Sequence, residues 1–178
     1  KGLRIGAFGW TGSYARKGTW NVTDANHKPV LDEDGKNVVE SGVRSLSKNR
    51  YAFSAEYAAN DWTFRSEYIH SQGYGFKTTY KTGKETDCNI NYAAGDKADG
   101  FYALMIAPVI SKKLYAKARY DMYRPTAEWN KAKTNYEIGA NYWIGKSIMI
   151  AAEYVRVNDR SLNKPNYNMF DLEFDVKF

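Results

Sequence analysis

The last nine residues of the chain, FDLEFDVKF (170–178), alternate strictly between bulky apolar and charged side chains. A period of two places successive residues on opposite faces of a β-strand, so this strand has one apolar and one charged face. A soluble antiparallel sheet turns its apolar face into a core, whereas an outer-membrane barrel turns that face towards lipid. One strand does not decide between these structures, so the pattern of the whole chain is needed.

Eight segments show this alternation, and each is bounded by turn-forming residues. The predicted strands cover about 2–15, 49–60, 62–74, 99–110, 113–124, 134–145, 146–158 and 166–178. Their connections alternate in length: those at 60–61, 111–113 and 145–146 are short, and the longest are the loops at about 17–48 and 75–98. Alternating long and short connections are typical of a bacterial barrel with extended outer loops and tight periplasmic turns. A Greek-key sandwich has no reason to keep this parity.

The composition agrees with a membrane barrel better than with a soluble sandwich. Aromatic residues make up 16% of the 178 residues, yet the mean hydropathy is -0.65 and 26% of residues are charged. A barrel with a polar lumen, polar loops and aromatic girdles combines these properties. The chain has no apolar run of about 18 residues, so it has no candidate transmembrane helix. We therefore predict an all-β fold, with residues 1–178 forming one antiparallel, transmembrane, up-and-down β-barrel domain of eight strands.

The charge and the cysteine content restrict the partners. The net charge is +6, but no DNA- or RNA-binding motif is present, so nucleic acid is not a predicted partner. A positively charged lumen that attracts anions explains the surplus of cations better than nucleic-acid binding does. Cys88 is the only cysteine, which excludes an internal disulfide.

Candidate metal and catalytic residues are few, and their spacing does not support either function. The stretch DEDGK (32–36) lacks the spacing and the closing Glu of an EF-hand, so it is interpreted as a solvated turn. His27 and His70 are the only histidines, too few for a three-histidine zinc site. Nothing in the spacing supports a Ser-His-Asp triad around His70. No metal, cofactor or catalytic residue is predicted.

Charged residues on the polar faces of the strands are the candidate pore lining. They are Arg65, Glu67, Lys117, Arg119, Asp121 and Glu153. Two interpretations stay open. The charges form lumen ion pairs that keep the wall hydrated, or the Arg and Lys side chains form an anion-attracting wall. Phe178 ends the apolar row of the last strand, and we expect the barrel-insertion machinery to recognise it as a membrane-insertion signal.

The second half of the chain resembles the C-terminal strands of phosphate-selective porins of the O and P type, as found in Bacteroidota-like bacteria. The resemblance covers about residues 99–178. It rests on the segments LYAKARYDMYRP (114–125), YEIGANYWIGKSIMIAAEYVRVND (136–159) and MFDLEFDVKF (169–178). In order, these contain an Arg-Tyr-Asp run, a Gly-x-Asn-Tyr strand, a Glu-Tyr strand and a final strand that ends in Phe. The dense basic ladder of a highly phosphate-selective pore is not evident in these strands.

This resemblance implies a passive diffusion channel for small polar or anionic solutes, including phosphate, in the outer membrane of a Gram-negative bacterium. It further implies a homotrimer surrounded by outer-membrane lipid, and about 16 strands, so that this chain supplies the C-terminal half of a larger barrel. Two alternatives remain. One is a complete eight-stranded barrel with a structural or adhesive role, and the other is a small outer-membrane enzyme.

Overall fold

The structure is a computed structural model that describes residues 2–77, 80–81, 84–85 and 88–177. The chain divides into two compact units. The sheet unit consists of Lys1–Gly9, Tyr51–His70 and Ala98–Phe178. The loop unit consists of Trp10–Arg50 and Ser71–Lys97.

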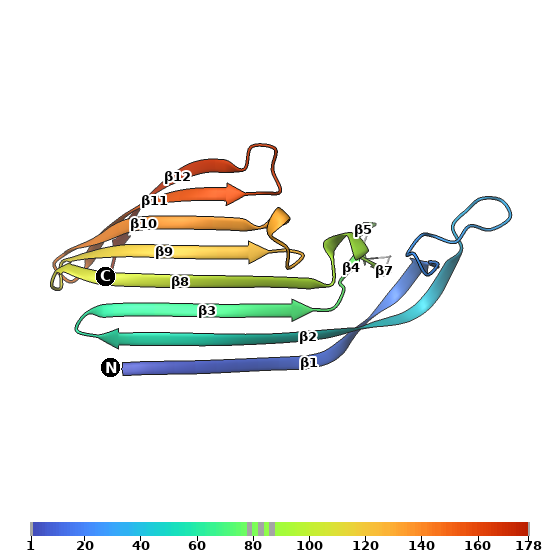
Figure 1. The fold of residues 1–178 in the computed structure, drawn as a ribbon, viewed down its shortest axis with the longest axis horizontal. Coiled ribbons are helices and arrows are strands. Elements are labelled where there is room, and N and C mark those ends of the chain that lie inside the picture. Colours follow the sequence, from blue (N-terminus) through green and yellow to red (C-terminus); the bar gives the residue numbers. More distant parts are fainter. Residues whose placement is uncertain (1, 78–79, 82–83, 86–87, 178) are drawn as a thin grey trace. The chain divides into compact units, whose positions relative to one another are not determined.

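The chain is all-β, and its main element is an eight-stranded antiparallel sheet in which the strands follow chain order. The order is β1-β2-β3-β8-β9-β10-β11-β12 (Figure 1). The strands are β1 (Gly2–Asn21), β2 (Val39–Ala59), β3 (Trp62–Gln72), β8 (Lys97–Ile110), β9 (Leu114–Arg124), β10 (Lys133–Ile144), β11 (Ile148–Asp159) and β12 (Asn166–Val176). This up-and-down order confirms the predicted antiparallel meander, with β1 and β12 as its two end strands.

The predicted strand positions are confirmed to within a few residues, except at the ends of β1 and β2. β1 continues to Asn21 and β2 begins at Val39, so the connection between them is 22–38 and not the predicted 17–48. The added strand lies in the loop unit and carries mostly polar or charged side chains. With so few apolar residues, these segments lack the apolar alternation that marks the other strands. The register between β8 and β9 shifts between Pro108 and Ile110, where the proline lacks the backbone N–H that regular pairing needs.

The predicted loop at 75–98 also contains regular structure. It holds β4 (Phe76–Lys77), β5 (Tyr80–Lys81), β6 (Lys84–Glu85) and β7 (Asn89–Ile90), followed by the 3-10 turn η1 (Tyr92–Ala94). β4 pairs with β7 and β5 with β6. The second 3-10 turn, η2 (Trp129–Lys131), lies between β9 and β10. Among the described residues, no helix is long and apolar enough to cross a membrane.

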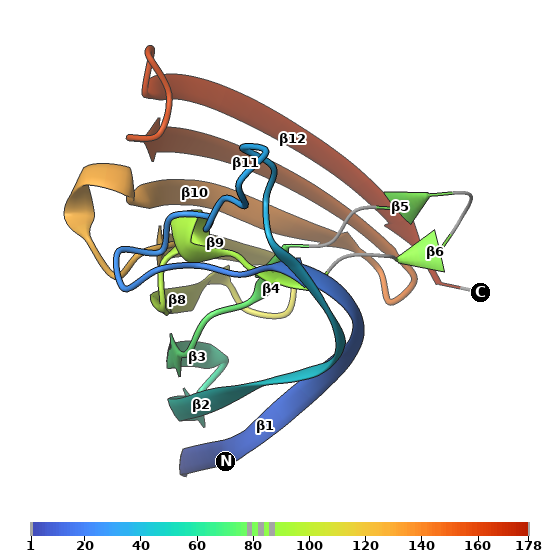
Figure 2. The same cartoon turned by 90° about the vertical axis from the view of Figure 1, so that its right-hand side faces the viewer.

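The strand register gives β8–β12 one apolar and one polar face, and Figure 2 shows these strands as a curved sheet. The apolar face is strongly exposed: the exposed fractions are 63% for Ile138, 68% for Phe170 and 70% for Leu172. On the opposite face, Val155 is 4% and Val157 0% exposed. No described segment of the sheet unit covers the apolar face, so this unit has the opposite arrangement to a soluble sheet with an apolar core.

Aromatic residues on the apolar face gather in two rows near the two ends of the strands. At the end with the long connections, Tyr51 contacts Tyr68, and Tyr120 contacts both Phe101 and Tyr136, with ring centroids 5.2–6.3 Å apart. At the end with the short turns, the exposed aromatic side chains are Trp62, Phe64, Tyr142 and Phe174, and the rings of Trp62 and Phe64 stack at 5.9 Å. Aromatic girdles at both interfaces are a property of outer-membrane barrels.

Candidate functional site on the polar face

The six candidate pore-lining residues all lie on the polar face of the sheet unit. Arg65 and Glu67 are on β3, Lys117, Arg119 and Asp121 are on β9, and Glu153 is on β11. The alternation within each strand and the register between β9, β10 and β11 bring the β9 and β11 members onto one surface. Sequence reasoning placed these residues on the correct face, but it did not identify their partners.

Lys117 pairs with Glu153 across an intervening strand. Both residues lie opposite Gly139 of β10 in the strand register. The Nζ of Lys117 is 2.6 Å from the Oε1 of Glu153, and the two side chains are only 19% and 22% exposed. A Cβ added to Gly139 would lie 2.9 Å from the Cγ of Glu153 and 2.6 Å from the carbonyl oxygen of Ala152. The missing side chain of Gly139 therefore leaves the space through which Lys117 reaches Glu153.

Arg119 is held on the neighbouring part of this face by two carboxylates. Its guanidinium donates to the Oδ1 of Asp121, with an Nη2–Oδ1 distance of 2.7 Å, and its Nε lies 4.0 Å from the Oε2 of Glu137. The guanidinium also lies over the ring of Tyr102, 5.1 Å from the ring centroid. Lys117 and Arg119 were the candidates for an anion-attracting wall, and each is paired with a carboxylate.

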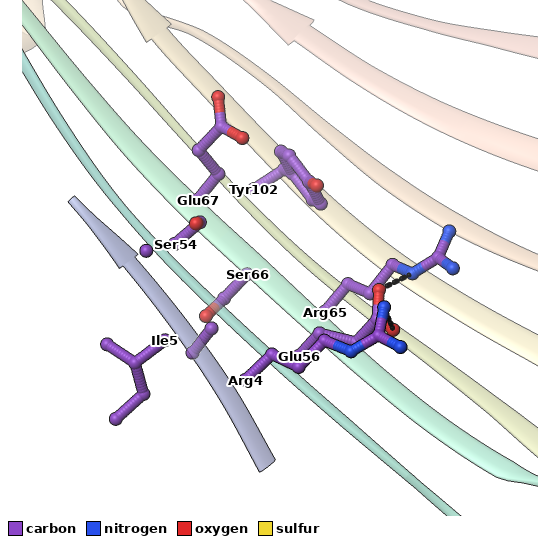
Figure 3. A pocket seen from close by; sticks show the side chains of 10 residues that line it. Arg4, Ile5, Ser54, Glu56, Arg65, Ser66, Glu67 and Tyr102 are labelled. Carbon is purple, nitrogen blue, oxygen red and sulfur yellow. Dashed lines mark hydrogen bonds and ion pairs between the residues drawn. The ribbon is translucent and has the colours of Figure 1, made fainter. Parts of the chain in front are cut away.

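Arg65 belongs to a second cluster, on β1–β3. Its Nε donates to the Oε2 of Glu56 at 2.7 Å, and the Nη1 of Arg4 lies 3.8 Å from the Oε1 of the same carboxylate. Figure 3 shows both guanidinium groups beside Glu56, with Glu67 and Tyr102 further along the same surface. These side chains line a hollow of about 320 Å³. The side chain of Ile5 extends on the other side of β1, as the alternation requires.

The charges on this face do not balance. In the described part of the sheet unit, the cations of the polar face are Arg4, Arg65, Lys117, Arg119, Lys133 and Lys177. The carboxylates of the same face are Glu56, Glu67, Asp121, Glu137, Glu153, Asp159, Asp171, Glu173 and Asp175. Nine carboxylates against six cations give this face a net charge of −3. Its chemistry is that of a hydrated surface that attracts cations more strongly than anions.

Sequence reasoning missed three parts of this site: Arg4, Glu137 and the space at Gly139. Arg4 was overlooked because only two charged residues, Lys1 and Arg4, precede Trp10, so the polar face of β1 has little charge pattern. The role of Gly139 depends on the register of three strands, which no local pattern contains. Glu137 lies between the apolar residues Tyr136 and Ile138 and was the one of the three that the alternation could have identified.

The other candidates from the sequence occupy ordinary structural positions. In DEDGK, the carboxylate of Asp32 accepts hydrogen bonds from the backbone N–H groups of Asp34 and Lys36, which makes the segment a turn, as predicted. His27 stacks on Tyr92 at 3.9 Å in the loop unit, and His70 stacks on Tyr51 at 5.0 Å in the sheet unit. Within the described ranges, no cluster of His, Cys, Asp and Glu could hold a metal ion. Phe178 lies outside the described residues.

Comparisons of the chain with family models, curated proteins and solved structures found no match.

Proposed function

We propose that this chain forms part of the wall of an outer-membrane channel that passes small polar solutes by diffusion. One observation carries the proposal: the sheet exposes a continuous apolar face and holds its charges on the opposite, less exposed face. Lipid solvates such an apolar face, and water in a lumen hydrates such a charged face. A water-soluble protein rarely leaves so large an apolar surface uncovered.

The length of the apolar face supports this proposal. On β10 the face runs from Tyr136 to Ile144, with Ile138, Ala140 and Tyr142 between them. Eight intervals of about 3.3 Å span about 26 Å along the strand. With a strand tilt of about 40°, this corresponds to about 20 Å across the membrane, close to the apolar band of about 25 Å in known barrels. The two aromatic rows then lie near the two interfaces, where amphipathic rings are enriched.

The proposal requires partners for the two end strands, because an unpaired strand edge is not tolerated in hydrocarbon. β1 and β12 either pair with each other or pair with further strands. We favour further strands, about 16 in total, because an eight-stranded barrel is filled by its own side chains and leaves no useful pore. The homotrimer, the outer membrane of a Gram-negative bacterium and recognition of Phe178 by the insertion machinery belong to this proposal through the resemblance to the O and P type porins.

The wall charge refines the proposed solute. A net charge of −3 on the polar face favours cations over anions, and the two cations nearest the centre of β9 are paired with carboxylates. We therefore propose small polar solutes with a preference for cations. The selection of anions or phosphate that the resemblance implies has no support in this part of the wall.

Conductance in a planar bilayer tests the proposed function. Protein folded in detergent should insert and give steady current steps, with a reversal potential in a salt gradient that corresponds to cation preference. Its folded state is checked beforehand by the heat-dependent shift of its band on a gel. Folded protein that inserts and passes no current would exclude the channel and favour the structural or adhesive alternative.

A further inference from the structure

The apolar face of β11 and β12 becomes polar at the end that carries the long connections. Along β11 the face reads Ile148, Ile150, Ala152 and Tyr154, and then Arg156 and Asn158. In the strand register Arg156 lies opposite Asn168 of β12 and opposite Tyr136 of β10, which belongs to the aromatic row. A charged side chain thus lies at the aromatic level of a face that we propose to be lipid-exposed.

A second arginine lies four residues further along the chain, at the same end of the strands. Arg160 follows β11, and its Nη1 donates to the backbone oxygen of Trp129 at 2.9 Å. Its guanidinium lies 5.8 Å from the centroid of the Trp129 ring, and that of Arg124 lies 4.8 Å from the centroid of the same ring. Trp129 is itself half exposed. Its contacts hold the Arg160 guanidinium in place and leave that side chain exposed.

These two arginines retain charge and hydrogen-bonding capacity. Arg156 donates from Nη1 to the Oδ1 of Asn168 at 2.8 Å, and each arginine has one hydrogen bond out of five donor groups. Neither forms an ion pair within the part of the chain that the structure describes. Both side chains are exposed.

The carboxylates near this rim have other partners. Asp99 binds the guanidinium of Arg124 through both oxygens, and its side chain is 2% exposed. The Oδ1 of Asp159 accepts hydrogen bonds from the backbone N–H and the hydroxyl of Ser161. Among the described residues, neither Arg156 nor Arg160 therefore forms a salt bridge with a carboxylate at this rim.

We propose that Arg156 and Arg160 bind the phosphates of anionic lipid headgroups in the outer leaflet. The inference rests on the proposed function, since it needs the apolar face to be in lipid. The headgroup region lies at the level of the aromatic row, and there an arginine keeps its stem along apolar surface and its guanidinium among phosphates. One guanidinium group can donate two parallel hydrogen bonds to two oxygens of a phosphate. The side-chain amides of Asn158, Asn166 and Asn168 add donors on the same face.

Binding of single lipids, measured by native mass spectrometry in a neutral detergent, tests the site. The probes are phosphatidylglycerol, which is anionic, and phosphatidylcholine, which is zwitterionic. The variant R156Q/R160Q removes both positive charges, and R156K/R160K keeps them without the paired geometry. The control K112Q/K113Q removes two exposed charges from the short turn at the opposite end of the strands. All variants are first shown to be folded and to float with phosphatidylcholine vesicles.

We expect wild-type protein and K112Q/K113Q to prefer phosphatidylglycerol. R156Q/R160Q should bind it about 30-fold more weakly, since each basic group near an anionic membrane surface contributes about a factor of five. The affinity of R156K/R160K for phosphatidylglycerol should lie between those of the wild type and R156Q/R160Q. Equal binding by R156Q/R160Q and wild type, or equal losses in R156Q/R160Q and K112Q/K113Q, would overturn the site. Folded protein that does not float with vesicles would instead overturn the proposed function.

Discussion

The space at Gly139 allows a sharp test of the strand register and of the polar wall. In Gly139→Ala, the new Cβ would lie 2.6 Å from the carbonyl oxygen of Ala152 and 2.9 Å from the Cγ of Glu153. The first contact is with backbone, so β10 and β11 must move apart by several tenths of an ångström. Overpacking of this kind costs about 1–3 kcal/mol. Loss of the Lys117–Glu153 ion pair, whose side chains are partly exposed, adds about 1 kcal/mol.

Gly100→Ala is the matched control. Gly100 lies on β8, and a Cβ there would be 3.6 Å from the backbone oxygen of Met122, an ordinary contact. Because alanine loses less backbone entropy than glycine on folding, this variant should be unchanged or up to about 1 kcal/mol more stable. The free energy of unfolding is measured by urea titration in detergent micelles, followed by tryptophan fluorescence and by gel mobility. If the free energies of unfolding of Gly139→Ala and Gly100→Ala agree within about 0.5 kcal/mol, the strand register on which the site is built is contradicted.

A double-mutant cycle separates the clash from the ion pair. Lys117→Met should destabilise the wild type, because it leaves Glu153 without its partner on a crowded surface. In the Gly139→Ala background the same change should cost less, since the pair is already displaced. If Lys117→Met costs the same free energy in both backgrounds, the gap at Gly139 is not what allows Lys117 to reach Glu153.

Three further predictions follow from the two faces of the sheet. Ile138→Lys should destabilise the protein in lipid by about 2–4 kcal/mol, as measured by reversible unfolding in vesicles, because it puts a charge at mid-height on the face that we propose to be lipid-exposed; a neutral effect would contradict lipid exposure. Asp99→Asn should cost about 3–5 kcal/mol, because it leaves Arg124 without its buried partner, and unchanged urea stability would contradict this. Asp171→Asn combined with Glu173→Gln should lower the cation-to-anion permeability ratio, determined from the reversal potential. An unchanged ratio would show that β12 does not face the ion path.

Much of the sheet could be predicted from sequence, because a strand between two different solvents must alternate. In β9 the residues from Leu114 to Arg124 show this alternation, and the strand was placed to within one residue. The same reasoning failed for 16–21 and 39–48, where both faces of the hairpin lie outside the sheet unit and need not differ. The pair of Lys117 and Glu153 was beyond prediction for another reason. Their contact depends on three strands in register and on a residue, Gly139, that contributes only space.

The net charge of the whole chain is a poor guide to what the wall attracts. The sequence carries +6, whereas the polar face of the sheet unit carries −3, so the remaining residues carry +9. The surplus cations are therefore outside the wall, and two of them, Arg156 and Arg160, lie at the rim of the apolar face. In a membrane wall, charge in the lumen affects ions in transit, and charge at the rim affects the anionic headgroups around it. Prediction of selectivity from a porin-like sequence thus requires the face of each charged residue, which strand alternation provides, and not the total.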